Sequence, residues 1–265
     1  MKTIKFTAVA VLMAVATSAS AQFANGSKVS GGMASDVEGH GSFYVQYNSL
    51  GVGDFSETLE DMDAESEKLT GFTVGFNKAV PVTSSMPLFL EVGAGLTYAW
   101  AKIYDEEESG DCNYCEDELS LRTKRSSQHL MVNIPVNVMY KFQVPNSSII
   151  LEPYVGLNVK GHILGQMKTK LSCDACCDDI EDKFEEYLDE IGEDGLTRDY
   201  FDKDDMGGKK YVAKRLNIGW QIGANVDFGK YFVGISYGSD FGKFMEYGSD
   251  DWTFSATNIT VGYRF

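Results

Sequence analysis

Three things are scarce in this chain: long apolar runs, basic residues and proline. Beyond the N-terminus no apolar run approaches the ~20 residues that a transmembrane helix needs, so any membrane span has to be made of strands. The 265 residues hold 23 Lys and Arg against 39 Asp and Glu, a net charge of -16. This balance argues against nucleic acid as a partner, because a phosphate backbone is bound by Lys and Arg. With only five prolines but 12% aromatic residues, the composition favours β-structure.

The N-terminus predicts a cleaved export signal over residues 1–21. A basic start is followed by an apolar run over 6–16, which is too short for a spanning helix. A small-x-small site comes next, and we expect cleavage to leave a new N-terminus directly after it. The residues of this junction are Ala19, Ala21 and Gln22. Residues 22–39 are polar and rich in Gly and Ser, and they predict a flexible periplasmic leader.

Eight later segments alternate apolar and polar residues with period two, the pattern of strands with two unlike faces. The final segment shows it well: Ile259, Val261 and Tyr263 lie on one face, and Thr260 and Gly262 on the other. The segments are 43–47, 72–76, 88–100, 129–142, 151–162, 216–228, 230–238 and 251–265.

A soluble β-sandwich also alternates, so further features are needed to choose between the two. The polar faces are rich in Gly and Asn, which suits a crowded lumen, and the apolar faces end in aromatic residues, which suits membrane interfaces. Connections alternate between short ones and long ones. The short ones are 79–87, 144–148 and 229–230, and the long ones are 51–68, 105–125, 169–210 and 242–250. We therefore predict an all-β fold over 40–265: a transmembrane antiparallel up-and-down β-barrel of about eight strands in the outer membrane of a Gram-negative bacterium.

The cleavage junction, the eight alternating segments and the last strand together resemble outer-membrane β-barrels of the Bacteroidetes type. The last strand ends in an aromatic residue that is preceded by apolar residues at every second position: Val261, Tyr263 and Phe265. The resemblance implies an OmpA-like, porin-like or PorT-like barrel domain whose final strand is read by the barrel assembly machinery. It implies location and fold, and little about activity.

Acidic residues are concentrated in the four long connections, which hold 32 of the 39 Asp and Glu. Such loops either bind Ca²⁺, an ion that prefers oxygen ligands, or form a hydrated and self-repelling surface. No loop has the Asp-x-Asp-x-Asp-Gly spacing of a dedicated calcium site, so the hydrated surface is favoured. No other cofactor is expected, apart from the zinc alternative considered next.

All five cysteines fall in two of these connections. They are Cys112, Cys115, Cys173, Cys176 and Cys177. Exported cysteines are usually oxidised, and an odd number leaves one thiol over. Two C-x-x-C pairs would also supply four thiolates for Zn²⁺. Disulfides or free thiols are favoured over the metal, and either bridge would join the two loops.

Residues 178–192 predict a short amphipathic helix within a long external loop. Ile180, Phe184, Tyr187, Leu188 and Ile191 repeat at helical spacing and form one apolar stripe. The stripe packs on the barrel mouth in the favoured interpretation, and a partner groove is the alternative.

Ionisable residues on the polar faces predict a lumenal ion-pair network near the periplasmic strand ends, because buried charge has to be paired. Its members are Glu91, Lys141, Glu152, Asp227 and Arg264. Of the three histidines, His129 and His162 point inward on different strands, and neither has a Ser or Asp partner pattern close in sequence. We expect them to be hydrogen-bonded lumenal residues, and we expect no catalysis.

The sequence therefore predicts a non-enzymatic outer-membrane barrel with acidic surface loops and a structural or surface-binding role. A narrow porin-like channel for small solutes or ions is the first alternative. An accessory part of a secretion system is the second. The expected partners are membrane lipid, the assembly machinery and a surface ligand that the sequence does not identify.

Overall fold

The computed structural model describes residues 38–52, 69–83, 86–111, 118–174, 182, 184, 186, 188–189, 197–204, 212–247 and 250–265. The export signal, most of the leader and the cysteines at 112, 115, 176 and 177 lie outside the described residues. No helix in the described part of the chain is long and apolar enough to cross a membrane.

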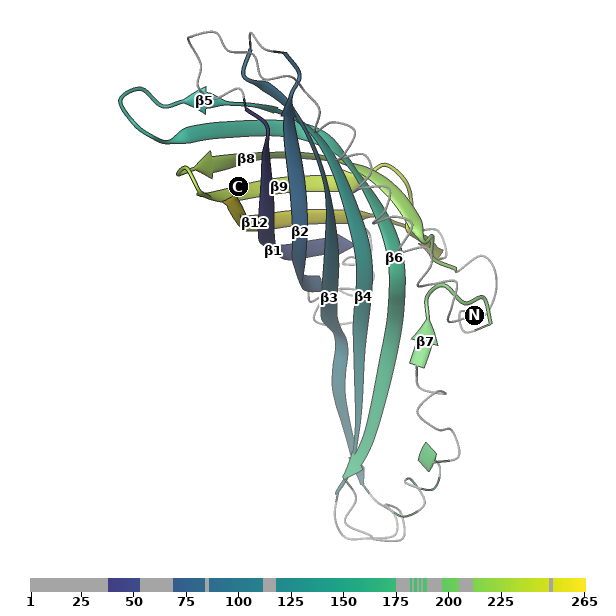
Figure 1. Ribbon diagram of the computed structural model, residues 1–265. Helices are drawn as coiled ribbons and strands as arrows, with labels where there is room; N and C mark the ends of the chain where they lie inside the picture. The colour runs from purple at the N-terminus through teal and green to yellow at the C-terminus, as the bar shows by residue number, and fades with distance from the viewer. Residues whose placement is uncertain are drawn as a thin grey trace.

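Eight long strands form a closed ring in which each pairs with both neighbours in antiparallel fashion (Figure 1). They are β1 (His40–Val52), β2 (Leu69–Pro81), β3 (Leu88–Asp111), β4 (Glu118–Tyr140), β6 (Ile150–Asp174), β8 (Leu216–Asp227), β9 (Tyr231–Asp240) and β12 (Phe254–Arg264). Neighbours in the ring are also consecutive in the chain, and β12 closes it against β1. The predicted eight-stranded up-and-down barrel is confirmed.

Four short strands accompany the barrel. They are β5 (Phe142–Gln143), β7 (Thr197–Asp199), β10 (Met245–Tyr247) and β11 (Asp250–Trp252). β5 and β7 pair with β6, whereas β10 and β11 form a hairpin of their own.

The outer face of the barrel is apolar and exposed, while the inner face is small or polar and buried. On β12, Val261 is 55% exposed and Thr260 is 8% exposed. Val45 of β1 and Val233 of β9 stand in register with Val261 on the same exposed face. Water is a poor solvent for so continuous an apolar surface, and closed barrels are the strand architecture that spans lipid. The structure is that of an outer-membrane β-barrel.

Two rows of aromatic residues run across the outer face. Tyr231, Tyr263, Phe43 and Phe76 follow one another in register across β9, β12, β1 and β2. A second row lies four residues away along β1 and β2, at Tyr47 and Phe72, and continues onto β3 at Tyr98. Valines fill the positions between the rows, as expected for a lipid-facing band with aromatic residues at its margins.

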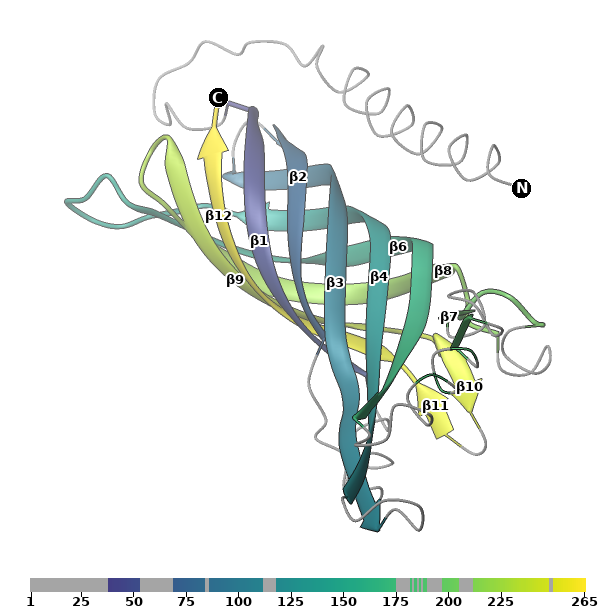
Figure 2. The ribbon, with the colours of Figure 1, turned by 90° about the horizontal axis from the view of Figure 1, so that it is seen from below.

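The two ends of the barrel differ. The turn end holds the start of β1, the end of β12 and the short connections, including the turn at Gly229, whose φ of 97° suits glycine. There Gly41 and Phe265 exchange two backbone hydrogen bonds of 3.0 Å. The opposite end, the loop end, carries the long connections. Figure 2 shows β10 and β11 at this loop end.

The predicted long connections 105–125 and 169–210 are wrong in part, because strand continues into both. β3 and β4 stay paired as far as Asp111 and Glu118, and β6 stays paired with β4 as far as Asp174. The register sets Asp105 opposite Lys124 as Cα partners along this extension. Backbone hydrogen bonds between strands do not require an apolar face. The strands therefore continue into water although apolar and polar residues no longer alternate along them.

The extension forms a feature that we call the projecting sheet: residues 101–111 of β3, 118–127 of β4 and 167–174 of β6. β2 reaches β3 only as far as Trp100, and β8 reaches β6 only as far as Gly161. At about 3.3 Å per residue, the eleven residues that follow Trp100, up to Asp111, extend roughly 36 Å. The three strands continue together beyond the other barrel strands (Figure 1).

The predicted helix over 178–192 is described at five positions, and all five are helical. They are Asp182, Phe184, Glu186, Leu188 and Asp189. Phe184 and Leu188 are half-buried, whereas the three acidic residues are exposed, as an amphipathic helix requires. The predicted connection 242–250 also differs, because it contains β10 and the start of β11.

Candidate functional site

The lumen is the candidate site, and its side chains fall into three layers. An ion-pair network lies at the turn end, a polar cavity lies in the middle, and an aromatic cluster with two histidines lies towards the loop end. Alternation along every strand places these side chains inward, since residues two apart share a face.

Arg264 is the centre of the turn-end network. Its guanidinium group binds both carboxylate oxygens of Glu152 in the two-pronged geometry that favours Arg–carboxylate pairs, with 2.8 Å between Nη1 and Oε1. It also pairs with Asp227. Glu152 is 0% exposed, Asp227 4% and Arg264 7%, so the charges are almost completely removed from water.

Lys141 adds a second cation to this layer. Its Nζ lies 3.4 Å from Oε1 of Glu152 and 4.5 Å from the ring centroid of Phe89. The Arg264 guanidinium lies 4.9 Å from the ring centroid of Phe232. Two cations thus face two carboxylates among aromatic rings, which balances the buried charge.

The predicted fifth member, Glu91, lies close by but within the described residues forms no ion pair. Its Oε1 accepts a hydrogen bond of 2.9 Å from Nδ2 of Asn137, and Oδ1 of Asn137 accepts one of 2.6 Å from Nε2 of Gln221. The structure therefore brings together four of the five predicted residues. Glu91 lies beside them and is hydrogen-bonded to the side-chain amide of Asn137, which is in turn hydrogen-bonded to that of Gln221.

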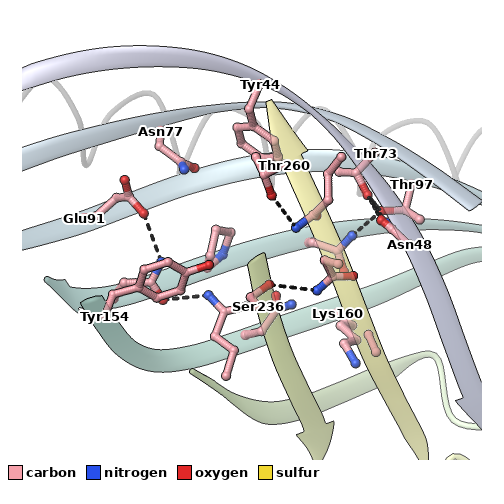
Figure 3. Close-up of a pocket in the computed structure, with 18 of the residues that line it drawn as sticks. Tyr44, Asn48, Thr73, Asn77, Glu91, Thr97, Tyr154, Lys160, Ser236 and Thr260 are labelled. Carbon is pink, nitrogen blue, oxygen red and sulfur yellow. Dashed lines mark hydrogen bonds between the residues drawn. The ribbon is translucent and has the colours of Figure 1, made fainter. Parts of the chain in front are cut away.

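The middle layer is a polar cavity of about 70 Å³. A cavity needs about 10–15 Å³ to hold one water, so this space has room for a few waters. Tyr44 and Tyr154 cross the lumen next to glycines of neighbouring strands, and Asn48, Thr73 and Thr97 form a hydrogen-bonded chain along one wall (Figure 3). A barrel of eight strands is filled by side chains rather than open, and this lumen follows that rule.

A second ion pair borders the cavity and was missed at the sequence level. Nζ of Lys160 lies 2.6 Å from Oδ1 of Asp240, and Asn217 donates a 3.2 Å hydrogen bond to Oδ2 of the same carboxylate. Lys160 lies two residues before His162 and shares its inward face on β6. Asp240 continues the inward positions of β9 beyond Gly238, so extending the alternation by two residues would have found it.

The loop-end layer, which we call the plug, surrounds two histidines with aromatic rings. His129 is 3% exposed and His162 is 4% exposed, and their ring centroids are 6.3 Å apart. Phe244 and Phe254 contact both imidazoles, and Tyr200 stacks on His129 at 5.4 Å.

Two expectations about these histidines are wrong. His129 does have a partner close in sequence, because Oγ of Ser127 lies 3.0 Å from its Nε2 and 3.1 Å from the Tyr200 hydroxyl. The inward positions i and i+2 of one strand explain this contact. His162 is not satisfied: within the described residues neither of its ring nitrogens has a hydrogen-bond partner, and Nδ1 of His129 also lacks one.

The plug is held in place by segments that return from outside the barrel. The backbone N–H of Tyr200 donates to the carbonyl of Gly165, and that of Ala213 donates to the carbonyl of Tyr200, at 2.9 and 2.8 Å. The N–H of Lys214 donates to the carbonyl of Phe244 at 2.7 Å. Burial raises the pKa of the Tyr200 phenol, so its hydroxyl stays neutral.

The remaining predicted residues lie elsewhere. Cys173 belongs to β6, where its Cα partner is Leu121 of β4, and the other cysteines lie outside the described residues. Among the described residues no group of three or more His, Cys, Asp or Glu is arranged to hold a metal. Val261, Tyr263 and Phe265 lie on the exposed outer face of β12, and their part in assembly stays a prediction.

No family model matches the chain, and the comparison with curated proteins gives no match. The comparison with solved structures gives small outer-membrane barrels. Ail, the attachment invasion locus protein of Yersinia pestis, was solved with the heparin analogue sucrose octasulfate; it is 11% identical, with 86% of this chain and 99% of that chain covered and a TM-score of 0.33. The outer membrane enzyme PagL is 12% identical; the match covers 84% of this chain and 98% of PagL, with a TM-score of 0.39. Neisserial surface protein A is 9% identical; the match covers 86% of this chain and 97% of that protein, with a TM-score of 0.32. These values are too low to indicate a shared activity.

Proposed function

We propose that this protein is a non-enzymatic outer-membrane barrel that binds a ligand at the cell surface through its projecting sheet. The observation that carries the proposal is the length of β3, β4 and β6, which have 24, 23 and 25 residues, whereas β8 and β9 have 12 and 10. The longer strands stay paired far beyond the barrel, so they form a stiff surface rather than separate loops.

The topology supports an outward direction for this sheet. The chain begins β1 and ends β12 at the turn end, and outer-membrane barrels have short turns on the periplasmic side and long loops outside. In this orientation the predicted export signal and leader precede a strand that starts on the periplasmic side. The resemblance of the last strand to Bacteroidetes-type barrels fits the same orientation.

The lumen supports a role outside the barrel rather than through it. The turn-end ion-pair network, the Lys160–Asp240 pair and the plug fill it around a cavity with room for a few waters. A narrow channel for small solutes or ions is the second candidate, and the polar cavity is the feature that favours it.

Shortening the projecting sheet tests the proposal. Lys102 and Ser126 are Cα partners, so residues 103–125 can be replaced by Asn-Gly, which closes a two-residue hairpin. We expect cells that display the shortened barrel to lose adhesion to extracellular-matrix proteins and to neighbouring cells, while the heat-modifiable gel shift of the folded barrel persists.

A matched measurement separates the two candidates. The purified intact protein is placed in planar bilayers at both polarities, and we expect no regular single-channel steps. Unchanged adhesion after the shortening would contradict the surface role, and regular steps from the intact protein would favour the channel instead.

A further inference from the structure

The plug contains buried nitrogen atoms that are not needed to fill the loop end of the lumen. Three of the four imidazole nitrogens of His129 and His162 have no hydrogen-bond partner among the described residues, although both side chains are more than nine-tenths buried. Buried polar groups are normally paired, since an unpaired donor or acceptor loses its hydrogen bonds to water and destabilises the fold. An apolar side chain would fill the same space without this cost.

Methionines stand beside the two imidazoles. Met131 of β4 is the Cα partner of His162 on β6, and His129 lies two residues before Met131, so the three side chains share one inner face. Met131 and Met245 are each 3% exposed and belong to the same core cluster as Phe244 and Phe254, which contact both imidazoles.

We propose that the plug is a binding site for a soft monovalent metal ion, Cu(I), with His129, His162 and Met131 as its ligands. Neutral imidazole nitrogen and thioether sulfur together select Cu(I), whereas Mg²⁺ and Ca²⁺ prefer oxygen. A single positive charge also suits this cluster, in which the ligands bring no carboxylate to balance a divalent ion.

The hydrogen bonds of His129 fit this role. Its Nε2 faces Oγ of Ser127 at 3.0 Å, so a proton on Nε2 would be donated to Ser127 and Nδ1 would be left free to bind the ion. A ligand histidine commonly donates its other N–H in this way, which fixes the tautomer and the ring orientation. Tyr200 extends the chain, because its hydroxyl lies 3.1 Å from Ser127.

The distance between the rings also fits. With metal–nitrogen bonds of about 2.0–2.1 Å, two imidazoles that share one ion have centroids roughly 5 to 6.4 Å apart, depending on the angle at the ion. The centroids of His129 and His162 are 6.3 Å apart, close to the upper limit, so the two imidazoles would bind from nearly opposite sides of the ion. Cu(I) adopts this nearly linear geometry, and Met131 would be a weaker third ligand from the side. The surrounding phenyl rings exclude water, and a dry shell of this kind tunes a metal site.

The test uses the purified mature chain in detergent micelles, with its cysteines reduced and then blocked by iodoacetamide so that thiols do not bind the metal. Cu(I) is added without oxygen in competition with bathocuproine disulfonate. We expect one equivalent to be retained, and X-ray absorption to show both nitrogen and sulfur neighbours. Zn²⁺ is added in a parallel sample and is expected to be retained more weakly.

Variants locate the site. We expect H129N, H162N and M131L each to weaken Cu(I) binding at least tenfold, and M131L to remove the sulfur signal. M131L preserves side-chain volume, and such exchanges are well tolerated. The matched control is M139L, which changes an equally buried methionine at the turn end and should leave binding unchanged.

Each outcome decides the proposal. The heat-modifiable gel shift shows which variants are folded, and the M131L and M139L pair suffices if a histidine variant does not fold. Absence of retained Cu(I) in the intact chain overturns the site, as does equal binding by M131L and M139L. Retention of Zn²⁺ in preference to Cu(I) overturns the assignment of a soft ion.

Discussion

Replacing Arg264 with methionine should strongly destabilise the barrel. The guanidinium group pairs with Glu152 and Asp227, which are 0% and 4% exposed. Methionine fills a similar volume but leaves two buried carboxylates with Lys141 as their remaining cation, at 3.4 Å from Glu152. The plug lies at the other end of the barrel, and the substituted side chain points into the lumen, so the effect should report on the network.

The structure sets the expected magnitude. Removal of one partner from a buried ion pair costs about 3–5 kcal/mol, because the other charge stays buried and unpaired. Lys141 offsets part of this for Glu152, so we expect a loss of about 3 kcal/mol in the free energy of unfolding for R264M. Adding E152Q removes one orphaned carboxylate, and the double variant should regain at least about 1 kcal/mol.

The assay is urea unfolding of the barrel in phosphatidylcholine vesicles, followed by tryptophan fluorescence and by the heat-modifiable gel shift. The control is K230M, which removes an exposed cation at the same end of the barrel and should change stability by less than about 0.5 kcal/mol. If R264M lies within about 1 kcal/mol of the unmodified protein, or if E152Q makes R264M less stable, the reasoning about buried charge is refuted.

Three further changes probe the outer face, the lumen and the terminus. V261R places a cation on the lipid-facing side and should destabilise the barrel by about 2–4 kcal/mol in the same urea assay; a smaller effect than that of K230M would mean that lipid does not cover this face. G75V should cost about 1–3 kcal/mol by overpacking, since a Cβ at Gly75 overlaps the ring of Tyr44; the cost of G75V should be smaller in a Y44A barrel than in the unmodified one, and equal costs in the two would argue against the overlap. Deletion of Phe265 should lower the fraction of chain inserted in the outer membrane, measured by fractionation; unchanged insertion would remove its predicted role in assembly.

The alternation of residue types was enough to predict which face of each strand is buried, and the aromatic strand ends and the connection lengths then favoured a barrel. At the C-terminus the apolar residues at 259, 261, 263 and 265 lie outward and the residues between them lie inward, and the same parity holds on β3, β8 and β9. Parity is a local property of extended chain, because successive side chains point to opposite faces. The polar faces therefore also indicated that Glu152, Asp227 and Arg264 would share the lumen.

The lengths of the strands could not be predicted in the same way. Beyond Trp100 the residues of β3 no longer alternate, and the segment resembles a charged loop. Its pairing with β4 depends on the register that begins within the barrel and continues outward by backbone hydrogen bonds. The projecting sheet therefore follows from tertiary register, not from a pattern in any one segment.

The side chains of the lumen show the same difference between what is local in the sequence and what depends on the closed barrel. The sequence by itself determined which side chains point inward, since this depends only on position along an extended strand. The tertiary structure alone decided which side chains from different strands meet: Arg264 with Glu152, Lys160 with Asp240, and His129 with His162. The shear and closure of the barrel fix these partners, and Arg264 and Glu152, 112 positions apart in the chain, become neighbours only when the ring closes.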